Sequence, residues 1–106
     1  MKEELQDLID LLHERKCSCV LRNGEIYTFE RRGVEDLYDL LREQPGLLLG
    51  ADVADKVVGK GAAALMVLGR VRRVYADVLS EPAYGLLFQT GISVSYGRLV
   101  SAIRNP

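Results

Sequence analysis

The stretch Gly50–Gly69, GADVADKVVGKGAAALMVLG, carries the strongest information on how this chain folds. It begins inside an almost uninterrupted apolar run, Leu47–Ala54, which predicts a strand buried on both faces. It ends in glycine, alanine and larger apolar residues, which predict a closely packed helix over 57–68. A charged turn with two glycines lies between them. The stretch therefore predicts a strand-to-helix junction with polar side chains.

Outside this stretch, apolar spacing and turn residues predict elements on both sides. They are a helix over 2–16, strands over 17–22 and 25–30, a helix over 34–43, a strand over 72–79, a helix over 81–89, a strand over 92–96 and a short helical tail over 98–104. Asn23-Gly24 indicates a hairpin with a type I′ turn, which requires positive φ at both residues. Ser80 and Pro82 suit the start of the fourth helix, and Gly69 is expected to cap the third.

After the hairpin, strands alternate with helices along the chain. This alternation implies right-handed crossovers and parallel strand pairing. The chain has 106 residues, of which 48% are hydrophobic and 27% charged, so it can form one packed core but not two. We therefore expect a single domain over residues 1–106, of the α/β class, with three α/β/α layers and a mixed five-stranded sheet.

Charge and composition narrow the classes of function. A formal net charge of −1 gives no general attraction to nucleic acid or to an anionic membrane. No apolar run reaches the roughly 20 residues that cross a bilayer, and the N-terminus lacks the layout of a signal peptide. Cys17 and Cys19 are expected to be small core-facing side chains in a reducing compartment. The expected location is the cytoplasm.

Two strand-to-helix junctions carry the residues that a ligand could contact. Ligands of open α/β sheets bind outside the carboxyl ends of parallel strands, and helix N-termini at that edge suit an anion. If the third and fourth strands are adjacent and parallel, both junctions open on the same side of the sheet. Tyr96, at the end of the last strand, is then expected to lie nearby. The predicted ligand-binding residues are Asp55, Lys56, Gly59, Lys60, Ser80, Glu81 and Tyr96.

A structural interpretation of the same residues stays open. The second junction is also simply a good helix start. Lys56 and Lys60 are four residues apart and could form a solvated face paired with Asp52 or Asp55.

Familiar motifs fit poorly. A P-loop fails because Ala54 replaces its first glycine and Gly61, not serine or threonine, follows the lysine. Gly59–Ala64 matches G-x-G-x-x-A, and Asp77 follows at about the right distance, but a domain of this size lacks the second half of a dinucleotide site. The only histidine, His13, and two cysteines are too few for a zinc site. We therefore expect no metal and no cofactor.

Four segments carry a resemblance that covers nearly all of the chain. NGEIYT (23–28), ADKVVGKGAAALM (54–66), VYADVLSEPA (74–83) and ISVSYGRLV (92–100) resemble a small prokaryotic family of unknown function. That family shares the cytidine deaminase fold and lacks its zinc-binding motifs. The resemblance implies a cytidine deaminase-like domain, and it implies a homo-oligomer because folds of this kind tend to form dimers or higher assemblies.

The resemblance also implies what the chain lacks. The deaminase motif His-Ala-Glu would fall on Val58-Gly59-Lys60, and Pro-Cys-x-x-Cys would fall within residues 80–85. The zinc ligands are therefore absent, and Lys60 stands where the acid/base glutamate would be. Since zinc-bound hydroxide is the nucleophile of those enzymes, zinc-dependent deamination is not expected.

Three functions stay open on these grounds. The first is binding of a small anionic ligand, such as a nucleotide, at the ends of the third and fourth strands. The second is a metal-independent enzyme at the same place, with Lys60 or Lys56 as base or nucleophile. The third is an oligomerising interaction module that docks through a sheet edge or the N-terminal helix.

Overall fold

The computed structural model describes residues 5–31 and 34–103. In chain order these residues form α1 (Leu5–Glu14), β1 (Cys19–Asn23), β2 (Glu25–Phe29), α2 (Glu35–Glu43), α3 (Pro45–Leu48), β3 (Asp52–Val58), α4 (Lys60–Gly69), β4 (Arg73–Ser80), α5 (Glu81–Gln89) and β5 (Ser93–Val100). The predicted order of elements is confirmed up to β5, with one short helix, α3, added. Within the described ranges, no helix is long and apolar enough to cross a membrane.

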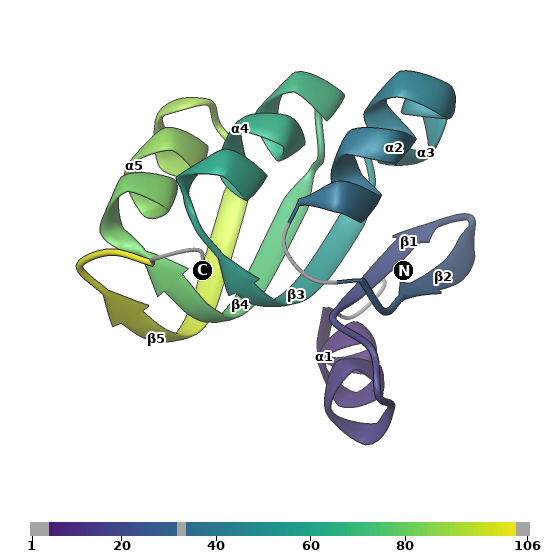
Figure 1. Ribbon diagram of the computed structural model, residues 1–106, viewed down its shortest axis with the longest axis horizontal. Helices are drawn as coiled ribbons and strands as arrows, with labels where there is room; N and C mark the ends of the chain where they lie inside the picture. The colour runs from purple at the N-terminus through teal and green to yellow at the C-terminus, as the bar shows by residue number, and fades with distance from the viewer. Residues whose placement is uncertain (1–4, 32–33, 104–106) are drawn as a thin grey trace.

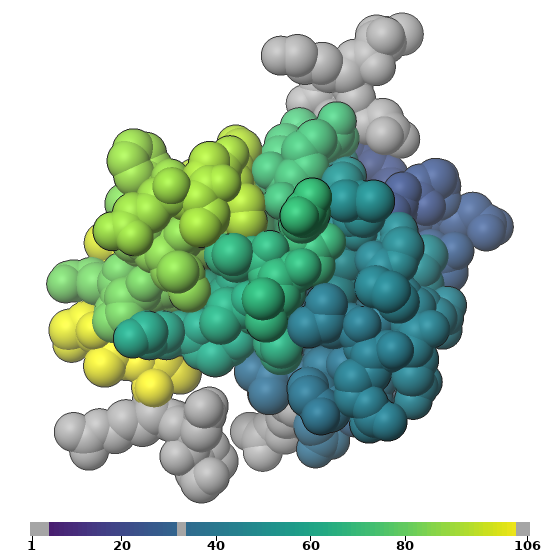
Figure 2. Space-filling model, turned by 90° about the horizontal axis from the view of Figure 1, so that it is seen from above, coloured from purple at the N-terminus to yellow at the C-terminus, as the bar shows by residue number. Residues whose placement is uncertain are grey.

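The five strands form one mixed sheet in the order β2-β1-β3-β4-β5. β1 pairs antiparallel with β2 and with β3, whereas β3, β4 and β5 run parallel. α1 lies on one face, against β1 and β3 (Figure 1). On the other face α2, α4 and α5 lie side by side, with α4 in the middle (Figure 2). The predicted sheet between two helical layers is therefore confirmed.

The sheet separates two apolar clusters of unequal size. The larger lies under α2 to α5, and its fully buried members include Leu21, Leu48, Val53, Val58, Met66, Val74, Leu79 and Leu87. The smaller lies under α1 and consists of Leu8, Leu12, Cys17, Val20 and Ala54. Cys17 and Cys19 belong to different clusters, and both are buried and free. The prediction that they are core-facing side chains is confirmed.

β3 begins at Asp52, later than the predicted start at residue 47. Pro45 starts the one-turn helix α3, so Leu47 and Leu48 are helical, and Gly50 turns the chain with φ +74° before the strand begins. A short apolar run does not distinguish a strand from a buried helical turn by periodicity, which explains the error.

The junction between β3 and α4 also lies later in the chain than predicted. The strand continues to Val58 and α4 begins at Lys60, so Lys56 lies inside the strand and not in a turn. The prediction of a helix beginning at residue 57 was wrong for the same reason.

β5 is longer than the strand that was predicted at the end of the chain. Its ladder with β4 continues to Ser80 opposite Val100, so residues 97–100 extend the strand predicted over 92–96. The described residues after it, 101–103, are not helical, and residue 104 of the predicted helical tail lies outside the described residues.

Two turns differ in detail from their predictions. The hairpin is confirmed, but only Gly24 has a positive φ, +78°, so Asn23 does not adopt the type I′ conformation. At the end of α4 the left-handed residue is Arg70, with φ +62°, and not Gly69. Gly69 is instead a point of close packing, because a Cβ there would lie 2.7 Å from Leu48 Cδ1 and 2.8 Å from Leu48 Cβ.

Gly69→Ala is therefore expected to lower the free energy of unfolding by about 1–3 kcal/mol, because the added methyl group overlaps Leu48. Urea unfolding measures the change. Gly85→Ala is the matched control, since a Cβ at this position in α5 meets nothing within 4 Å. Alanine should stabilise that helix by about 0.5–1 kcal/mol. Equal effects of the two variants would contradict close packing at Gly69.

Asp52 is the most strongly bound polar side chain of the fold. Arg22 on β1 and Arg73 on β4 lie opposite it in the two neighbouring ladders, and Arg72 precedes β4. Its carboxylate accepts hydrogen bonds from Arg22 at 3.1 Å, from Arg72 at 2.8 and 3.1 Å, and from Arg73 at 2.8 and 2.9 Å. The alternative that a lysine pairs with Asp52 was wrong, because three arginines surround it.

Candidate functional site

The two predicted junctions lie at the same edge of the sheet. β3 and β4 are adjacent and parallel, and Val58 lies opposite Leu79 in their ladder. α4 and α5 begin within two residues of these positions and pack along each other on one face (Figure 2). Neighbouring strands lie about 5 Å apart. The sheet therefore brings Gly59 and Lys60 close to Ser80.

The two helices begin in different ways. In α5, Ser80 is buried and accepts a hydrogen bond from the Ala83 N–H at 3.2 Å, and Glu81 adds negative charge to the first turn. In α4, the N-cap is Gly59, which has no side chain to accept a bond, and the first turn has no acidic residue. Lys60 places a positive charge where the helix dipole is already positive. The start of α4 is therefore electrostatically unsatisfied by its own side chains.

We name residues Gly59–Gly61 the α4 junction. A Cβ at Gly59 would lie 3.5 Å from Ile103 Cβ, and a Cβ at Gly61 would lie 3.8 Å from Val34 Cγ1. The junction is thus flanked by the residue before α2 and by the chain after β5. Lys60 is exposed between them. Neither glycine has a Cβ that could shield the backbone of the junction.

Asp55 lies inside β3, three residues before its end, and is buried. Burial raises the pKa of its carboxyl to about 7, although hydrogen bonds from the N–H groups of Val57 and Lys56 and from the Cys19 thiol oppose the rise. Burial, and then the charge of Asp55, raise the pKa of the Cys19 thiol well above its ordinary value. Asp55 is therefore a carboxyl that takes up a proton near neutral pH, beneath the surface.

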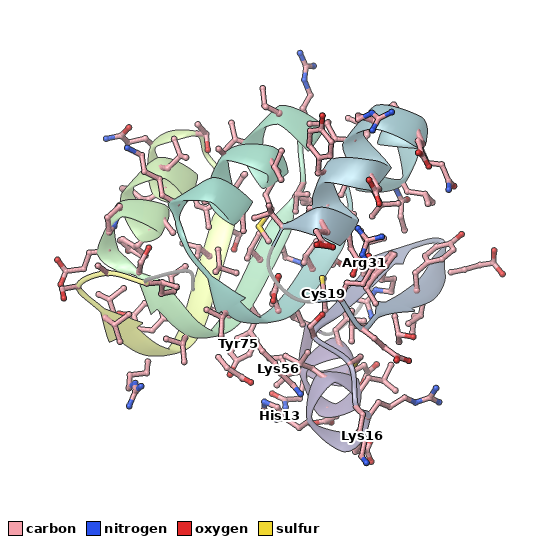
Figure 3. The ribbon with its side chains drawn as sticks, viewed as in Figure 1. His13, Lys16, Cys19, Arg31, Lys56 and Tyr75 are labelled. Atoms are coloured by element: carbon pink, nitrogen blue, oxygen red, sulfur yellow. The ribbon has the colours of Figure 1, made fainter. Side chains whose placement is uncertain are left out.

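The remaining predicted residues do not join the α4 junction. Lys56 is exposed and projects on the α1 side of the sheet (Figure 3). Since α4 lies on the other side, Lys56 and Lys60 face apart. Tyr96 lies in the middle of β5, opposite Ala76, and its ring packs edge to face with Tyr84 at 6.0 Å. Its expected place at the strand end was wrong, because β5 extends to Val100.

Comparison with protein families gives a match over most of the chain. The model of a domain of unknown function, DUF1893 (TM1506), matches residues 7–106. The chain belongs to the DUF1893 family. A crystal structure of a DUF1893 family protein from Thermotoga maritima is similar, with a TM-score of 0.86 and 24% sequence identity over 99% of this chain and 73% of that one. At this identity the likeness shows the fold. No curated protein matches the chain.

The DUF1893 fold also gathers residues that were not predicted to form a site. The Asp77 carboxylate bonds the imidazole of His13 at 2.7 Å and accepts a hydrogen bond from the Tyr75 hydroxyl at 2.8 Å. Alternation along β4 places Tyr75 and Asp77 on one face. The missing information was that α1 packs on that face, because nothing local in the sequence says which side of the sheet a helix covers.

One open pocket of this DUF1893 domain lies at the opposite edge of the sheet from the α4 junction. It has a volume of about 300 Å³ and is open to solvent. Its lining residues come from α3 and the end of α4 and are Pro45, Gly46, Leu49, Leu68, Gly69 and Arg70. It therefore shares no residue with the predicted site.

Metal-ligand side chains do not gather in the described part of this DUF1893 domain. Across residues 5–31 and 34–103, no three His, Cys, Asp or Glu side chains lie as they would around a metal ion. The aspartates that are buried, Asp52 and Asp55, have arginine, backbone and thiol partners instead.

Proposed function

We propose that this DUF1893 domain binds a small anionic ligand, such as a nucleotide, at the α4 junction. The observation that carries the proposal is the start of α4, which combines a glycine N-cap, no acidic residue in the first turn and Lys60 at the first helical position. The first N–H groups of a helix have no partner within it and carry partial positive charge. An anion satisfies both these groups and the lysine.

The N-terminus of α5, at the same edge of the sheet, differs from that of α4, and this difference supports an anion site at α4. The N-terminus of α5 is already occupied by Ser80 and Glu81. An anion would therefore meet a closed helix start at α5 and an open one at α4. Phosphate groups bind at helix N-termini that follow glycine-containing junctions in many α/β proteins.

We also infer that the domain is related in fold to the cytidine deaminases without their reaction. The order of elements and the two helix starts at one sheet edge support the relation, and fold alone assigns no chemistry. At the place of the first deaminase motif the chain has Val58-Gly59-Lys60, with no zinc ligand among them. The proposed function is therefore binding, not hydrolytic deamination.

Lys60→Gln is expected to weaken the binding of AMP about tenfold, because it removes one charge-assisted contact to the phosphate. Isothermal titration of the purified domain measures the affinity. Lys16→Gln is the matched control, since it removes the same charge from an exposed lysine beside α1, on the other side of the sheet. It should leave AMP binding unchanged. Adenosine, which lacks the phosphate, should bind far more weakly than AMP.

A second variant tests the helix start itself. Gly59→Ser supplies an N-cap hydroxyl that competes with the ligand for the free N–H groups. The space accepts it, since the nearest atom to a new Cβ is 3.5 Å away. This variant should bind AMP more weakly while remaining folded. Binding that is equal in wild type, Lys60→Gln and Gly59→Ser, or no binding by wild type at millimolar AMP, would exclude the α4 junction as the site.

A further inference from the structure

Half of one sheet face is left open by the helices. α1 covers β1 and β3, whereas no described helix lies over β4 and β5 on this side (Figure 1). The side chains of β5 that alternate toward this open half are Ser93 and Ser95, which are exposed, followed by Gly97. The border between α1 and the open half is where His13, Lys56, Tyr75 and Asp77 lie.

Asp77 contacts two of these side chains, His13 and Tyr75. Its Oδ1 atom holds His13 Nε2 at 2.7 Å and accepts from Tyr75 at 2.8 Å. Burial, and then the hydrogen bond to Asp77, raise the pKa of Tyr75 to about 12, so the hydroxyl remains a donor across the physiological range. Because one ring nitrogen of His13 is held by Asp77, the ring is oriented and its other nitrogen is directed elsewhere. The side chain of His13 is half exposed.

Lys56 adds a positive charge to the same place. It lies in β3 between the positions that pair with Ala76 and Val78, so Asp77 is its neighbour in the ladder. Figure 3 shows Lys56, Tyr75 and His13 close together on the α1 side of the sheet. Within residues 5–31 and 34–103, the Lys56 side chain makes no ion pair.

β5 packs directly against these groups at Gly97. A Cβ at Gly97 would lie 2.9 Å from the Asp77 carbonyl oxygen and 3.2 Å from the Tyr75 hydroxyl. Any other residue at this position would press against both groups. The glycine therefore lets β5 pass close to the Tyr75 hydroxyl without displacing it from Asp77.

We propose that His13, Lys56, Tyr75 and Asp77 form a second ligand site, which takes a small anion that also carries a hydroxyl group, as in a sugar phosphate. Lys56 binds the anionic group. The second carboxylate oxygen of Asp77 accepts from the ligand's hydroxyl, and the free ring nitrogen of His13 forms the third contact. The site lies on the opposite side of the sheet from α4, so it is independent of the α4 junction.

The single histidine of the chain makes the test direct. The imidazole of His13 gives one set of ring signals in an NMR spectrum, with no other histidine to obscure it. Glycerol 3-phosphate, which has both groups, is expected to shift these signals in a saturable way. Glycerol should give no saturable shift, and inorganic phosphate should bind at least about threefold more weakly than glycerol 3-phosphate.

Variants of the full chain complete the test. In the titration of the His13 signals, Lys56→Gln should weaken the binding of glycerol 3-phosphate about tenfold, whereas Lys60→Gln, which alters the other proposed site, should leave that titration unchanged. Asp77→Asn should weaken it as well and alter the ring signals of the free protein, since the partner of His13 changes. No saturable shift with wild type, equal binding by Lys56→Gln, or glycerol 3-phosphate binding no better than inorganic phosphate would overturn the proposal. A loss in Lys60→Gln alone would assign the binding to the α4 junction instead.

Discussion

Asp52→Asn is expected to lower the free energy of unfolding by about 3–5 kcal/mol at pH 7, because it removes the negative member of a largely buried group of ion pairs. Asp52 is almost fully buried, and so is Arg22, which donates to it from β1. Arg73 is mostly buried and Arg72 is exposed. The variant removes the one negative charge that all three share. Urea unfolding at constant salt measures the loss.

The pH dependence of that loss follows from the same contacts. Burial would raise the pKa of Asp52, but the hydrogen bonds from Arg73, Arg72 and Arg22 outweigh it and hold the pKa well below its usual value of 3.8. A group whose pKa is lower in the folded state stabilises the fold above its unfolded pKa and loses that contribution as the pH falls. The difference between wild type and Asp52→Asn should therefore be full at pH 5 and shrink below pH 4.

Asp39→Asn is the matched control for this prediction. Asp39 pairs with Arg31 at 3.0 Å, and both side chains are well exposed to solvent. Exposed pairs contribute roughly 0–1 kcal/mol, so this variant should lie close to wild type. If Asp52→Asn cost no more than Asp39→Asn, the arginines around Asp52 would not stabilise the fold.

The contrast between these aspartates shows what the sequence could and could not predict. The features that were right rest on neighbouring residues, such as the Asn23-Gly24 hairpin and the Ser80 N-cap. The arginine partners of Asp52 depend instead on strand order, since β1 and β4 lie on either side of β3. Strand order is a property of the whole sheet, and no spacing along the chain reports it.

The candidate site also combines features that the sequence could predict with features that it could not. That the two junctions share one edge was predictable, because adjacent parallel strands end together. The place of Lys56 was not, because a shift in the start of β3 moved it from a turn into a strand. His13 was considered only as a possible zinc ligand, yet α1 packs on the sheet so that His13 reaches Asp77, 64 positions along the chain.

Asp55→Asn is expected to stabilise the domain at high pH and to have little effect at low pH. The buried carboxyl has a pKa of about 7 in the fold, against an ordinary value of 3.8. A group whose pKa is raised on folding stabilises the fold below its unfolded pKa and loses that contribution as the pH rises through the folded pKa. The gap corresponds to at most about 4 kcal/mol. Asparagine keeps the shape and carries no charge at any pH.

Urea unfolding at pH 4, 7 and 9 provides the measurement. The variant and wild type should have similar stability at pH 4, and at pH 9 the variant should be more stable by about 2–4 kcal/mol, because only wild type then buries a charge. Glu81→Gln is the control, since Glu81 is an exposed carboxyl at the neighbouring helix start. Its stability should lie within about 1 kcal/mol of wild type across the range, and any difference should be a loss, because Glu81 favours the start of α5.

The opposite signs of the two aspartate predictions make them a joint test of the sheet. Asp52 and Asp55 lie three residues apart in β3, one among arginines and the other beside a thiol and backbone N–H groups. If burial alone set their behaviour, both substitutions would stabilise the domain at high pH. If partners decide it, asparagine destabilises at position 52 and stabilises at position 55. A destabilised Asp55→Asn at pH 9 would mean that the Asp55 carboxylate has a cationic partner or open access to water.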